Sequence, residues 1–397
     1  MRKIRLFTPG PTPLSPEAQE ALGRPIIHHR TPEYAELHKA TVANLKKIFK
    51  TSNDLLLLSA SGTGAMEAAV NNLLNASNHV LVVVAGKFGE RWYELCEKFG
   101  VPATALCKEY GEAASVDEIR SKIKENPEID ALLLQGSETS TATSHDLRAI
   151  GNMLRSEFPE VISVVDGITS VACEWLETDE WGLDIVISGS QKAFAVPPGL
   201  SFLSVSPRTL EQMKANQAPR YYFDLPKEAE KQAEGKTAYT SSVSLTAALH
   251  ATTESILQHG LKRVIGETAE MAHATREGLT RLGFKLLSQA PANACTAAYP
   301  PDGISGSDLA RELHERFGLK VAGGQGRLKG RIIRIAHLGY FDQLDVFTVL
   351  GAIEVCLKEM GADIEVGSGV SAAIRASVRE PMEALGGVHG AGEGPEA

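Results

Sequence analysis

The sequence has little of what marks disulfide-stabilised, membrane-spanning or nucleic-acid-binding proteins. Its five cysteines are widely spaced and form no Cys-x-x-Cys pair, which argues against a disulfide framework or a metal site. No apolar run approaches the ~20 residues that a transmembrane helix needs, and the N-terminus lacks the apolar core of a signal peptide. The net charge of -9, with dispersed Lys and Arg, disfavours a nucleic-acid groove. We therefore expect a cytoplasmic globular protein without nucleic-acid, membrane or metal partners.

Apolar runs alternate with helix-prone segments through the first half of the chain. At 397 residues and 43% hydrophobic content, the sequence is long enough for two domains of ordinary composition. The expected strands are 55–58, 79–84, 103–107, 130–134, 161–166, 184–188 and 200–205. This alternation predicts an α/β fold with a mostly parallel, seven-stranded sheet covered by helices on both faces.

The second half of the chain has a different texture. Residues 208–240 are polar and are expected to be irregular, and a helix-prone run over 243–283 leads into a smaller α+β unit. Residues 386–394 are rich in glycine and are expected to be flexible. The predicted divisions are an N-terminal arm at 1–20, a large domain at 21–255, a small C-terminal domain at 256–362, and a Gly/Ala-rich, partly flexible tail at 363–397.

Lys192 follows a β-branched run and a turn of small residues. The segment Asp184-Ile-Val-Ile-Ser-Gly-Ser-Gln-Lys192 reads as a buried strand that ends in hydroxyls and a flexible backbone. Pro197-Pro198-Gly199 then turns the chain back into another apolar run. A lysine held there would have a depressed pKa and could act as a Schiff-base amine, although a lysine capping a surface loop is the alternative.

Asp166 stands at the end of a second β-branched run, Val161-Ile-Ser-Val-Val165. Ligands of open α/β sheets bind at the carboxyl ends of parallel strands, where this carboxylate is expected. An acid beside the pyridine nitrogen is what pyridoxal phosphate needs to act as an electron sink. A helix N-cap is the alternative role for an isolated Asp, but Lys192 nearby in the sequence favours the cofactor.

A glycine-rich turn, Ser59-Ala-Ser-Gly-Thr-Gly64, separates a predicted strand from a predicted helix. Backbone N–H groups and the hydroxyls of Ser61 and Thr63 would meet at the helix N-terminus, where an anion is favoured. The turn matches neither a P-loop nor the dinucleotide fingerprint. It is a candidate phosphate site, and a purely structural turn is the alternative.

Together these segments resemble the class V aminotransferases of fold type I, in the group of alanine-glyoxylate, serine-pyruvate and serine-glyoxylate aminotransferases. The resemblance covers roughly residues 5–360 and rests on an ordered set of motifs. Besides Ser61-Gly-Thr63 and Asp166, the set comprises Thr8-Pro-Gly-Pro-Thr12, His28-His29-Arg30-Thr31-Pro32-Glu33, Gly86-Lys-Phe-Gly-Glu-Arg91, Glu138-Thr-Ser-Thr141, Ser188-Gly-Ser-Gln-Lys192, Tyr239-Thr240 and Arg334-Ile-Ala.

The resemblance implies pyridoxal 5′-phosphate as the cofactor, Lys192 as the lysine that binds it covalently, and Asp166 as the partner of the pyridinium nitrogen. The implied phosphate ligands are Ser61, Gly62, Thr63 and Gln191. By position, Phe88 and Ile168 would contact the two faces of the ring, and Ser140 would lie near the phenolic oxygen. Tyr239 and Thr240 would reach across a homodimer interface to the neighbouring phosphate, so the active sites would be shared.

Arg334 lies in the alternating segment Arg331-Ile-Ile-Arg-Ile-Ala336, on the opposite face from Ile333 and Ile335. A guanidinium on a sheet can offer its planar fork to a carboxylate. By resemblance, Arg334 would bind the substrate α-carboxylate, and Gly10 of the N-terminal motif would also contact substrate. The alternative is a surface charge on a half-exposed strand.

These observations predict transamination by a ping-pong mechanism between a small amino acid, serine or alanine, and a small 2-oxo acid, glyoxylate or pyruvate. A small donor is favoured because no second arginine obviously pairs with Arg334 to hold a distal carboxylate. The alternatives are a phosphoserine aminotransferase, another class V enzyme such as a desulfurase or lyase, and a non-catalytic subunit associated with a hydrogenase.

Overall fold

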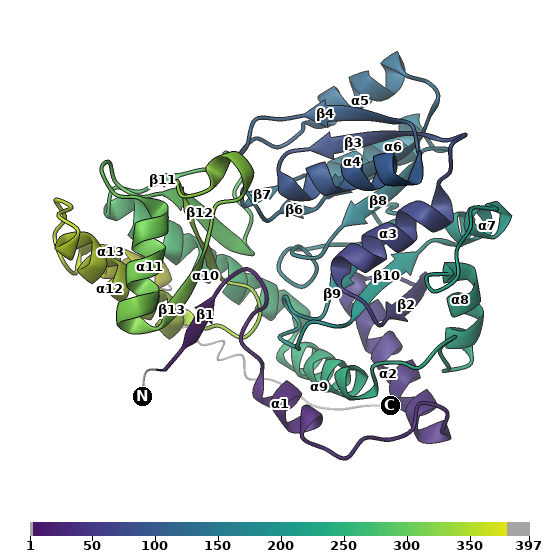
Figure 1. Cartoon of the computed structure of the whole chain (residues 1–397), viewed down its shortest axis with the longest axis horizontal. Helices are drawn as coiled ribbons and strands as arrows, with labels where there is room; N and C mark the ends of the chain where they lie inside the picture. Colours follow the sequence, from purple (N-terminus) through teal and green to yellow (C-terminus); the bar gives the residue numbers. More distant parts are fainter. Residues whose placement is uncertain (1–2, 379–397) are drawn as a thin grey trace, which may run out of the picture.

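A seven-stranded sheet forms the centre of the larger part of the molecule in this computed structural model, which describes residues 3–378 (Figure 1). The strand order is β2-β10-β9-β8-β5-β3-β4, and only β10 runs antiparallel to its neighbours. The strands are β2 (Asp54–Leu58), β3 (His79–Val84), β4 (Ala103–Cys107), β5 (Ile129–Gln135), β8 (Ile162–Asp166), β9 (Ile185–Gly189) and β10 (Ser201–Val205). The predicted α/β fold with a mostly parallel, seven-stranded sheet is confirmed.

Helices cover both faces of this sheet because its strands are apolar on both sides. Successive side chains of a strand point to opposite faces, so Leu57 and Val186 face one core while Leu58 and Ile187 face the other. The helices on the first face are α2 (Pro32–Phe49), α5 (Val116–Glu125), α6 (Leu147–Glu157) and α9 (Val243–His259). The helices on the second face are α3 (Gly62–Leu73), α4 (Lys87–Phe99), α7 (Pro207–Ala215) and α8 (Leu225–Ala233).

A five-stranded, mostly antiparallel sheet forms a second unit with its own core. Its order is β1-β13-β14-β12-β11, with bounds β1 (Arg5–Phe7), β11 (Lys285–Leu286), β12 (Cys295–Tyr299), β13 (Leu319–Gly323) and β14 (Ile333–Ala336). Its helices are α10 (Leu261–Arg281), α11 (Gly306–Phe317), α12 (Gln343–Glu359) and α13 (Ser368–Ser377). The N-terminal strand β1 pairs in parallel with β13, so the chain starts in this unit before it enters the larger one through α1 (Pro16–Leu22).

Two segments are more regular than the sequence suggested. Residues 208–240, expected to be irregular, contain α7 and α8, and that expectation was wrong for these helices. Both begin with an N-cap followed by proline in the first turn, Ser206-Pro207 and Asp224-Leu225-Pro226, a start signal that their polar composition obscured. Helix α13 lies within the range 363–397 predicted as a tail and packs against the small core through Ala373.

The predicted domain boundary at 255/256 stays a prediction, and it falls near the end of α9, just before α10 begins. The glycine-rich stretch 386–394 lies outside the described residues. Within residues 3–378, no helix is both long and apolar enough to cross a membrane.

Candidate active site

Lys192 lies at the turn that follows β9, where the N-terminal arm crosses the seven-stranded sheet. Its Nζ donates a hydrogen bond to the Pro9 carbonyl at 2.5 Å, and its own carbonyl accepts from Thr12 Oγ1 at 3.0 Å. Burial lowers the pKa of Lys192 to about 8, and the nearby Asp166 carboxylate partly opposes this shift. The sequence-based expectation of a buried lysine with a depressed pKa therefore agrees with its surroundings.

Gly10 lies against the Lys192 side chain. A Cβ atom at Gly10 would stand 2.3 Å from Nζ, and its φ of +132° is one that other residues rarely adopt. Both facts require glycine at this position. The arm that follows β1 therefore brings Gly10, predicted to contact substrate, against the Lys192 amine.

Asp166 is the last residue of β8 and is buried at the carboxyl end of the parallel strands. Its Oδ1 accepts a hydrogen bond from the Ile168 backbone N–H at 3.0 Å, and its Oδ2 has no donor among residues 3–378. Burial raises the pKa of Asp166 to about 6; the Ile168 N–H lowers it, and the Glu138 carboxylate raises it. A carboxylate oxygen without a donor in the described part of the chain, on a residue that is only 4% exposed, therefore lies beside the strand that leads to Lys192 and is available to a cationic ring nitrogen.

The N-terminus of α3 carries the predicted phosphate residues. Ser61 is the N-cap but makes no side-chain cap hydrogen bond, and Thr63 Oγ1 accepts from Arg91 Nη1 at 3.0 Å. A Cβ at Gly62 would stand 2.4 Å from Ile168 Cδ1, so glycine allows Ile168 to pack against this turn. The buried Gln191 Oε1 has no hydrogen-bond partner among the described residues. The free backbone N–H groups of the first turn of α3 favour an anion at this helix end, whereas Gln191 Oε1 can only accept a hydrogen bond.

The N-terminus of α4 and the segment around Ser140 form a further wall of the candidate site. Arg91 stacks over the Phe88 ring, with 4.9 Å between the guanidinium carbon and the ring centroid. Ser140 Oγ accepts from the Lys87 backbone N–H at 3.0 Å and donates to the Glu138 carboxylate at 2.5 Å. Phe88 and Ser140, predicted from distant motifs, therefore lie on one wall.

Arg334 projects from β14 of the small unit toward the large sheet. It is only 6% exposed, and it donates from Nε to the Gly323 carbonyl at 3.0 Å and from Nη1 to the Thr139 carbonyl at 2.9 Å. Its Nη2 has no hydrogen-bond partner within residues 3–378. Because burial also lowers the pKa of Arg334, an anion at Nη2 would relieve an electrostatic cost. The surface-charge interpretation of Arg334 does not agree with this burial.

Tyr239 and Thr240 are the predicted site residues that this chain does not bring to Lys192. They line a small cavity with Ser59 and Tyr222 beside the end of β2. Neither side chain hydrogen-bonds to Lys192, Asp166 or the Ser61–Thr63 turn in the part of the chain that the structure describes.

A known protein family matches most of this chain. Residues 17–330 match the family model for class-V aminotransferases. The chain belongs to the class-V aminotransferase family. Its enzyme class is therefore aminotransferase, and the resemblance identified in the sequence is confirmed.

Class-V relatives extend over almost the whole chain. The protein named soluble hydrogenase, small subunit, from Synechococcus sp. (strain PCC 6716) is 36% identical, over 94% of this chain and 98% of that protein. The serine–glyoxylate aminotransferase of Arabidopsis thaliana is 30% identical, over 93% of this chain and 94% of that protein. Among solved structures, the subgroup IV aspartate aminotransferase of Thermus thermophilus has a TM-score of 0.84 and 34% identity, covering 90% of this chain and 99% of that chain.

Pyridoxal phosphate is the cofactor of class-V aminotransferases, and the residues around Lys192 fit it. The fit rests on the buried amine of Lys192, the unused Oδ2 of Asp166 and the uncapped N-terminus of α3. The buried Gln191 Oε1 has no donor within residues 3–378, and the Gln191 amide could offer a phosphate a hydrogen bond only through its Nε2.

Three residues of this class-V site had no role assigned from the sequence: Pro9, Arg91 and Glu138. The motifs quoted for the N-terminal arm, α4 and the 138–141 segment contain all three. The spacing of Phe88 and Arg91, three residues apart on one helix face, is a signal that could have shown their contact. The contact of Pro9 with Lys192 has no local sequence signal, because the two residues are 183 positions apart.

Proposed function

We propose that this aminotransferase transfers an amino group from serine or alanine to glyoxylate or pyruvate by a ping-pong mechanism. The observation that carries the proposal is Lys192, a buried amine with a lowered pKa, between the free carboxylate oxygen of Asp166 and the buried guanidinium of Arg334. The relative named serine–glyoxylate aminotransferase supports the choice of substrates.

Several residues would hold the cofactor in this proposal. Pyridoxal phosphate, when bound, supplies an electron sink for the electron pair left on the substrate α-carbon. Asp166 would accept a hydrogen bond from the protonated ring nitrogen of the cofactor. Phe88 and Ile168 would contact the two faces of the cofactor ring, and Ser140 would lie near its phenolic oxygen. The phosphate ligands would be Ser61, Gly62, Thr63 and Gln191.

Lys192 would move the proton. A pKa of about 8 leaves a substantial neutral fraction of Lys192 near neutral pH, and that fraction grows as pH rises through 8. The neutral Nζ would take the proton from the substrate α-carbon, and the resulting ammonium would deliver it to C4′ of the cofactor on the same face. Pro9 and Gly10, which cover the amine, would limit the access of water.

Arg334 Nη2 would bind the substrate α-carboxylate, since Nε and Nη1 are already occupied by backbone carbonyls. Two cations near this wall are already paired with acids, which supports a small, uncharged donor. Lys87 pairs with Glu90, and Arg327 pairs with Glu109 at 2.9 Å. A distal carboxylate would have to displace one of these acids, which would cost affinity.

Arg334→Lys, measured across a panel of amino donors and 2-oxo acceptors, tests this assignment. The wild-type enzyme should prefer serine or alanine with glyoxylate or pyruvate over aspartate and phosphoserine. The variant should lose at least about tenfold in kcat/KM for every substrate, because a charge-assisted hydrogen bond contributes about 1.5–3 kcal/mol. The affinity for pyridoxal phosphate should change little.

The control is Arg331→Lys, since Arg331 lies exposed in the turn just before β14 and stacks on Tyr299. It should retain wild-type kcat/KM. Loss of pyridoxal phosphate from Arg334→Lys with unchanged kcat/KM in the remaining loaded enzyme would assign Arg334 to the cofactor site. A wild-type preference for aspartate or phosphoserine would overturn the proposed donor.

A non-catalytic partner of a hydrogenase is the second candidate, favoured by the relative named soluble hydrogenase, small subunit. The same substrate panel separates the two functions. A protein that binds pyridoxal phosphate but transfers no amino group from any donor would support the second candidate.

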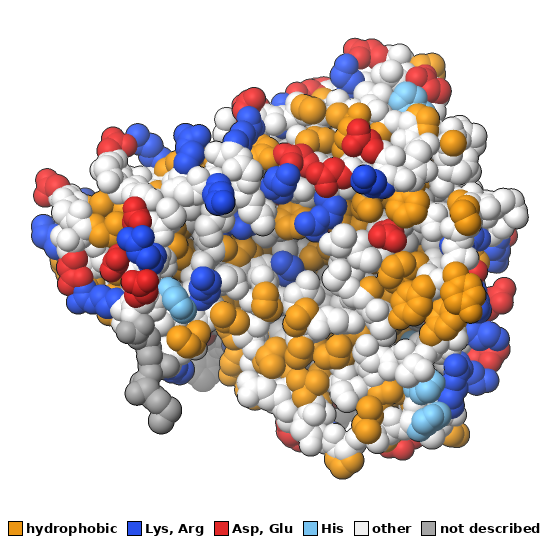
Figure 2. Space-filling view, viewed as in Figure 1, with side chains coloured by type: hydrophobic (Ala, Val, Ile, Leu, Met, Phe, Trp, Pro, Cys, Tyr) orange, Lys and Arg blue, Asp and Glu red, His pale blue; other side chains and the backbone are white. Residues whose placement is uncertain are grey.

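We also propose a homodimer with shared active sites. Tyr239 and Thr240 lie apart from Lys192 in their own chain, which leaves them available to a second copy. Tyr221 and Tyr222 beside them are 79% and 47% exposed, and the Tyr222 and Tyr239 rings stack at 5.2 Å. Figure 2 shows hydrophobic side chains gathered on the side of this face where α1, α8 and α9 lie. An exposed apolar patch of this kind is typical of an interface.

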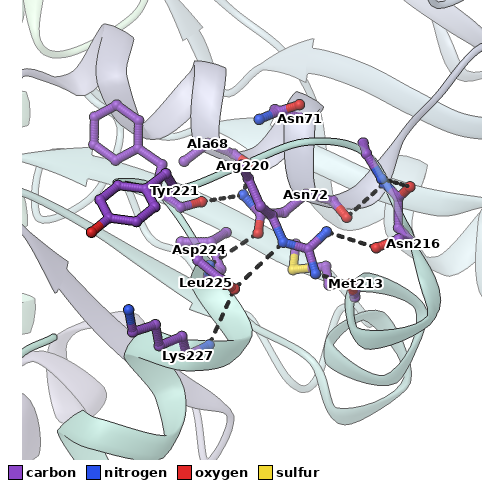
Figure 3. Close-up of polar contacts among 12 residues, drawn as sticks. Ala68, Asn71, Asn72, Met213, Asn216, Arg220, Tyr221, Asp224, Leu225 and Lys227 are labelled. Atoms are coloured by element: carbon purple, nitrogen blue, oxygen red, sulfur yellow. Dashed lines mark hydrogen bonds and ion pairs between the residues drawn. The ribbon is translucent and has the colours of Figure 1, made fainter.

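A polar network holds the loop that presents these tyrosines (Figure 3). Arg220 donates to the carbonyls of Asn216 and Met213 at 2.9 and 2.8 Å, and Asn72 Nδ2 donates to the Phe223 carbonyl. The Leu225 N–H in turn donates to Asn72 Oδ1 at 3.0 Å. The tyrosines are therefore exposed on an anchored loop, which lowers the entropy cost of forming an interface.

Tyr222→Asp should weaken dimerisation at least about tenfold, because a charge would be buried in an aromatic interface contact. Sedimentation velocity over a dilution series, with specific activity measured on the same samples, gives both quantities. Val366→Asp places a charge on another exposed apolar residue, in the small unit, and should behave as wild type. A monomer with full specific activity would contradict the shared site.

A further inference from the structure

Glu138 is a buried carboxylate beside Phe88 and Ser140, and the proposed reaction gives it no role. It is fully buried, and it lies in the short strand β6 (Ser137–Glu138), which pairs with β7 (Thr143–Ser144). Both oxygens are occupied. Oε2 accepts from the backbone N–H groups of Phe88 and Gly89 at 3.0 Å each, and Oε1 accepts from the Ser140 N–H at 3.0 Å and the Ser140 hydroxyl at 2.5 Å.

The first pair of contacts caps helix α4 from a distant part of the chain. The N-cap residue of α4 is Gly86, which has no side chain to accept the free N–H groups of the first turn. Glu138 accepts two of them and places a negative charge at the positive end of the helix dipole. Since Phe88 is one of the two donors, the direction in which its ring leaves the helix depends on this carboxylate.

The second pair of contacts orients Ser140. Its hydroxyl donates to Glu138 and accepts from the Lys87 N–H, so the hydroxyl hydrogen has a defined direction. The junction is also tightly packed. A Cβ on Gly86 would stand 2.4 Å from Ser140 Oγ and 2.6 Å from Glu138 Cδ. The carboxylate therefore links the helix that carries Phe88 to the segment that carries Ser140.

We propose that Glu138 is a positioning residue of the pyridoxal phosphate site, whose ionised carboxylate holds Phe88 and Ser140 in the geometry that receives the cofactor. Burial raises the pKa of Glu138 above its ordinary value, and the hydrogen bonds from Ser140, Gly89 and Phe88 oppose that rise because they favour the ionised form. A glutamine cannot replace it, because its amide nitrogen would face N–H donors on one side or the other. This role of Glu138 rests on the binding of pyridoxal phosphate and does not depend on which amino acid is the donor.

Glu138→Gln tests this role through cofactor affinity rather than activity. The apo-protein is titrated with pyridoxal phosphate while absorbance and tryptophan fluorescence are recorded, and its melting temperature is measured separately. We expect the dissociation constant to rise at least about tenfold, the change for the loss of one charge-assisted hydrogen bond. The visible band of the bound cofactor should also shift, because Ser140 and Phe88 would no longer be held.

Glu354→Gln is a matched control. Glu354 is a second buried carboxylate that accepts N–H groups at a helix start, from Gly369 and Val370 of α13 at 2.7 and 2.9 Å, in the core of the small unit. It should lower the melting temperature as Glu138→Gln does and leave the dissociation constant within about twofold of wild type. Equal loss of cofactor affinity in both variants would make the effect of Glu138 a general loss of stability and would overturn the proposal.

Two further variants keep the test decisive. In a Phe88→Leu background, Glu138→Gln should cost less affinity than it does alone, because coupled residues are non-additive. If Glu138→Gln does not fold, Gly86→Ala displaces the carboxylate by steric contact and should also weaken binding at least about tenfold. Wild-type affinity for pyridoxal phosphate in Gly86→Ala, or additive effects in the double variant, would overturn the proposed role of Glu138. Neither result would contradict the proposed amino-group transfer.

Discussion

Replacement of Lys192 by alanine is expected to abolish steady turnover and the visible absorption of lysine-bound pyridoxal phosphate. The structure offers the substrate α-carbon no other buried amine with a lowered pKa among residues 3–378. A positioned acid–base group contributes about 10²–10⁴-fold to the rate, and Lys192 would also supply the covalent attachment of the cofactor. We therefore expect kcat to fall by more than about a thousandfold. Single-turnover and steady-state assays with the purified protein measure it.

Lys320→Ala is the control for this variant, because Lys320 is an exposed lysine of β13 in the small unit. It should keep the colour and activity of the wild type. A Lys192→Ala enzyme that still forms a borohydride-stable link to the cofactor and turns over normally would show that another amine is the reactive group.

Asp166→Asn should keep the fold and lower kcat by at least about a hundredfold, the typical loss when one preorganised electrostatic partner is removed from an active site. The free Oδ2 of Asp166 is the group that would hold a proton on the cofactor nitrogen, and an amide cannot balance that charge. Steady-state kinetics and the absorption spectrum of the loaded enzyme report the two effects. Near-normal kcat would remove Asp166 from the ring nitrogen.

Asp184→Asn is the matched control for Asp166. Asp184 is also buried beside the central sheet, but it lies just before β9, at the amino end of the strand, and pairs with Arg208 at 2.6 Å. Its loss should lower the melting temperature, since Asp184 is a buried carboxylate whose hydrogen bonds to Arg208 and Ser163 would be broken, while kcat of the folded fraction stays near the wild-type value.

The strands of the large sheet could be predicted because each one is indicated by a short stretch of adjacent residues. Runs such as Ile185-Val-Ile187 are apolar at every position, and each ends in a polar turn, which together indicate a strand covered on both faces. The antiparallel direction of β10 could not be derived this way, because strand direction depends on how the Pro197–Gly199 turn returns the chain. Helices α7 and α8 were missed because most of their residues are polar and only a few, such as Met213 and Leu225, are buried in the core.

The local setting of a residue was predictable where its motif also contains the neighbouring element. Ser61 and Thr63 lie at a helix start visible in the sequence, Asp166 ends β8, and Lys192 lies in the turn after β9. The role of Glu138 was not predictable in this way, because its carboxylate meets donors 49 and 50 residues away that only the folded sheet brings close. The burial of Arg334 likewise depends on Thr139 of the other unit.

The pairing of β1 with β13 has a consequence for the order of assembly during synthesis. Residues 5–7 leave the ribosome before any strand of the large sheet, yet their partners at 319–321 follow only after that whole sheet has been made. Contacts between such distant positions form late, because the chain entropy of closing the loop must be overcome first. The segment from Pro9 to Thr12 begins just after β1, so its position over Lys192 would be fixed only once residues 319–321 have been made. A nascent chain would hold the Lys192 amine less well covered until then.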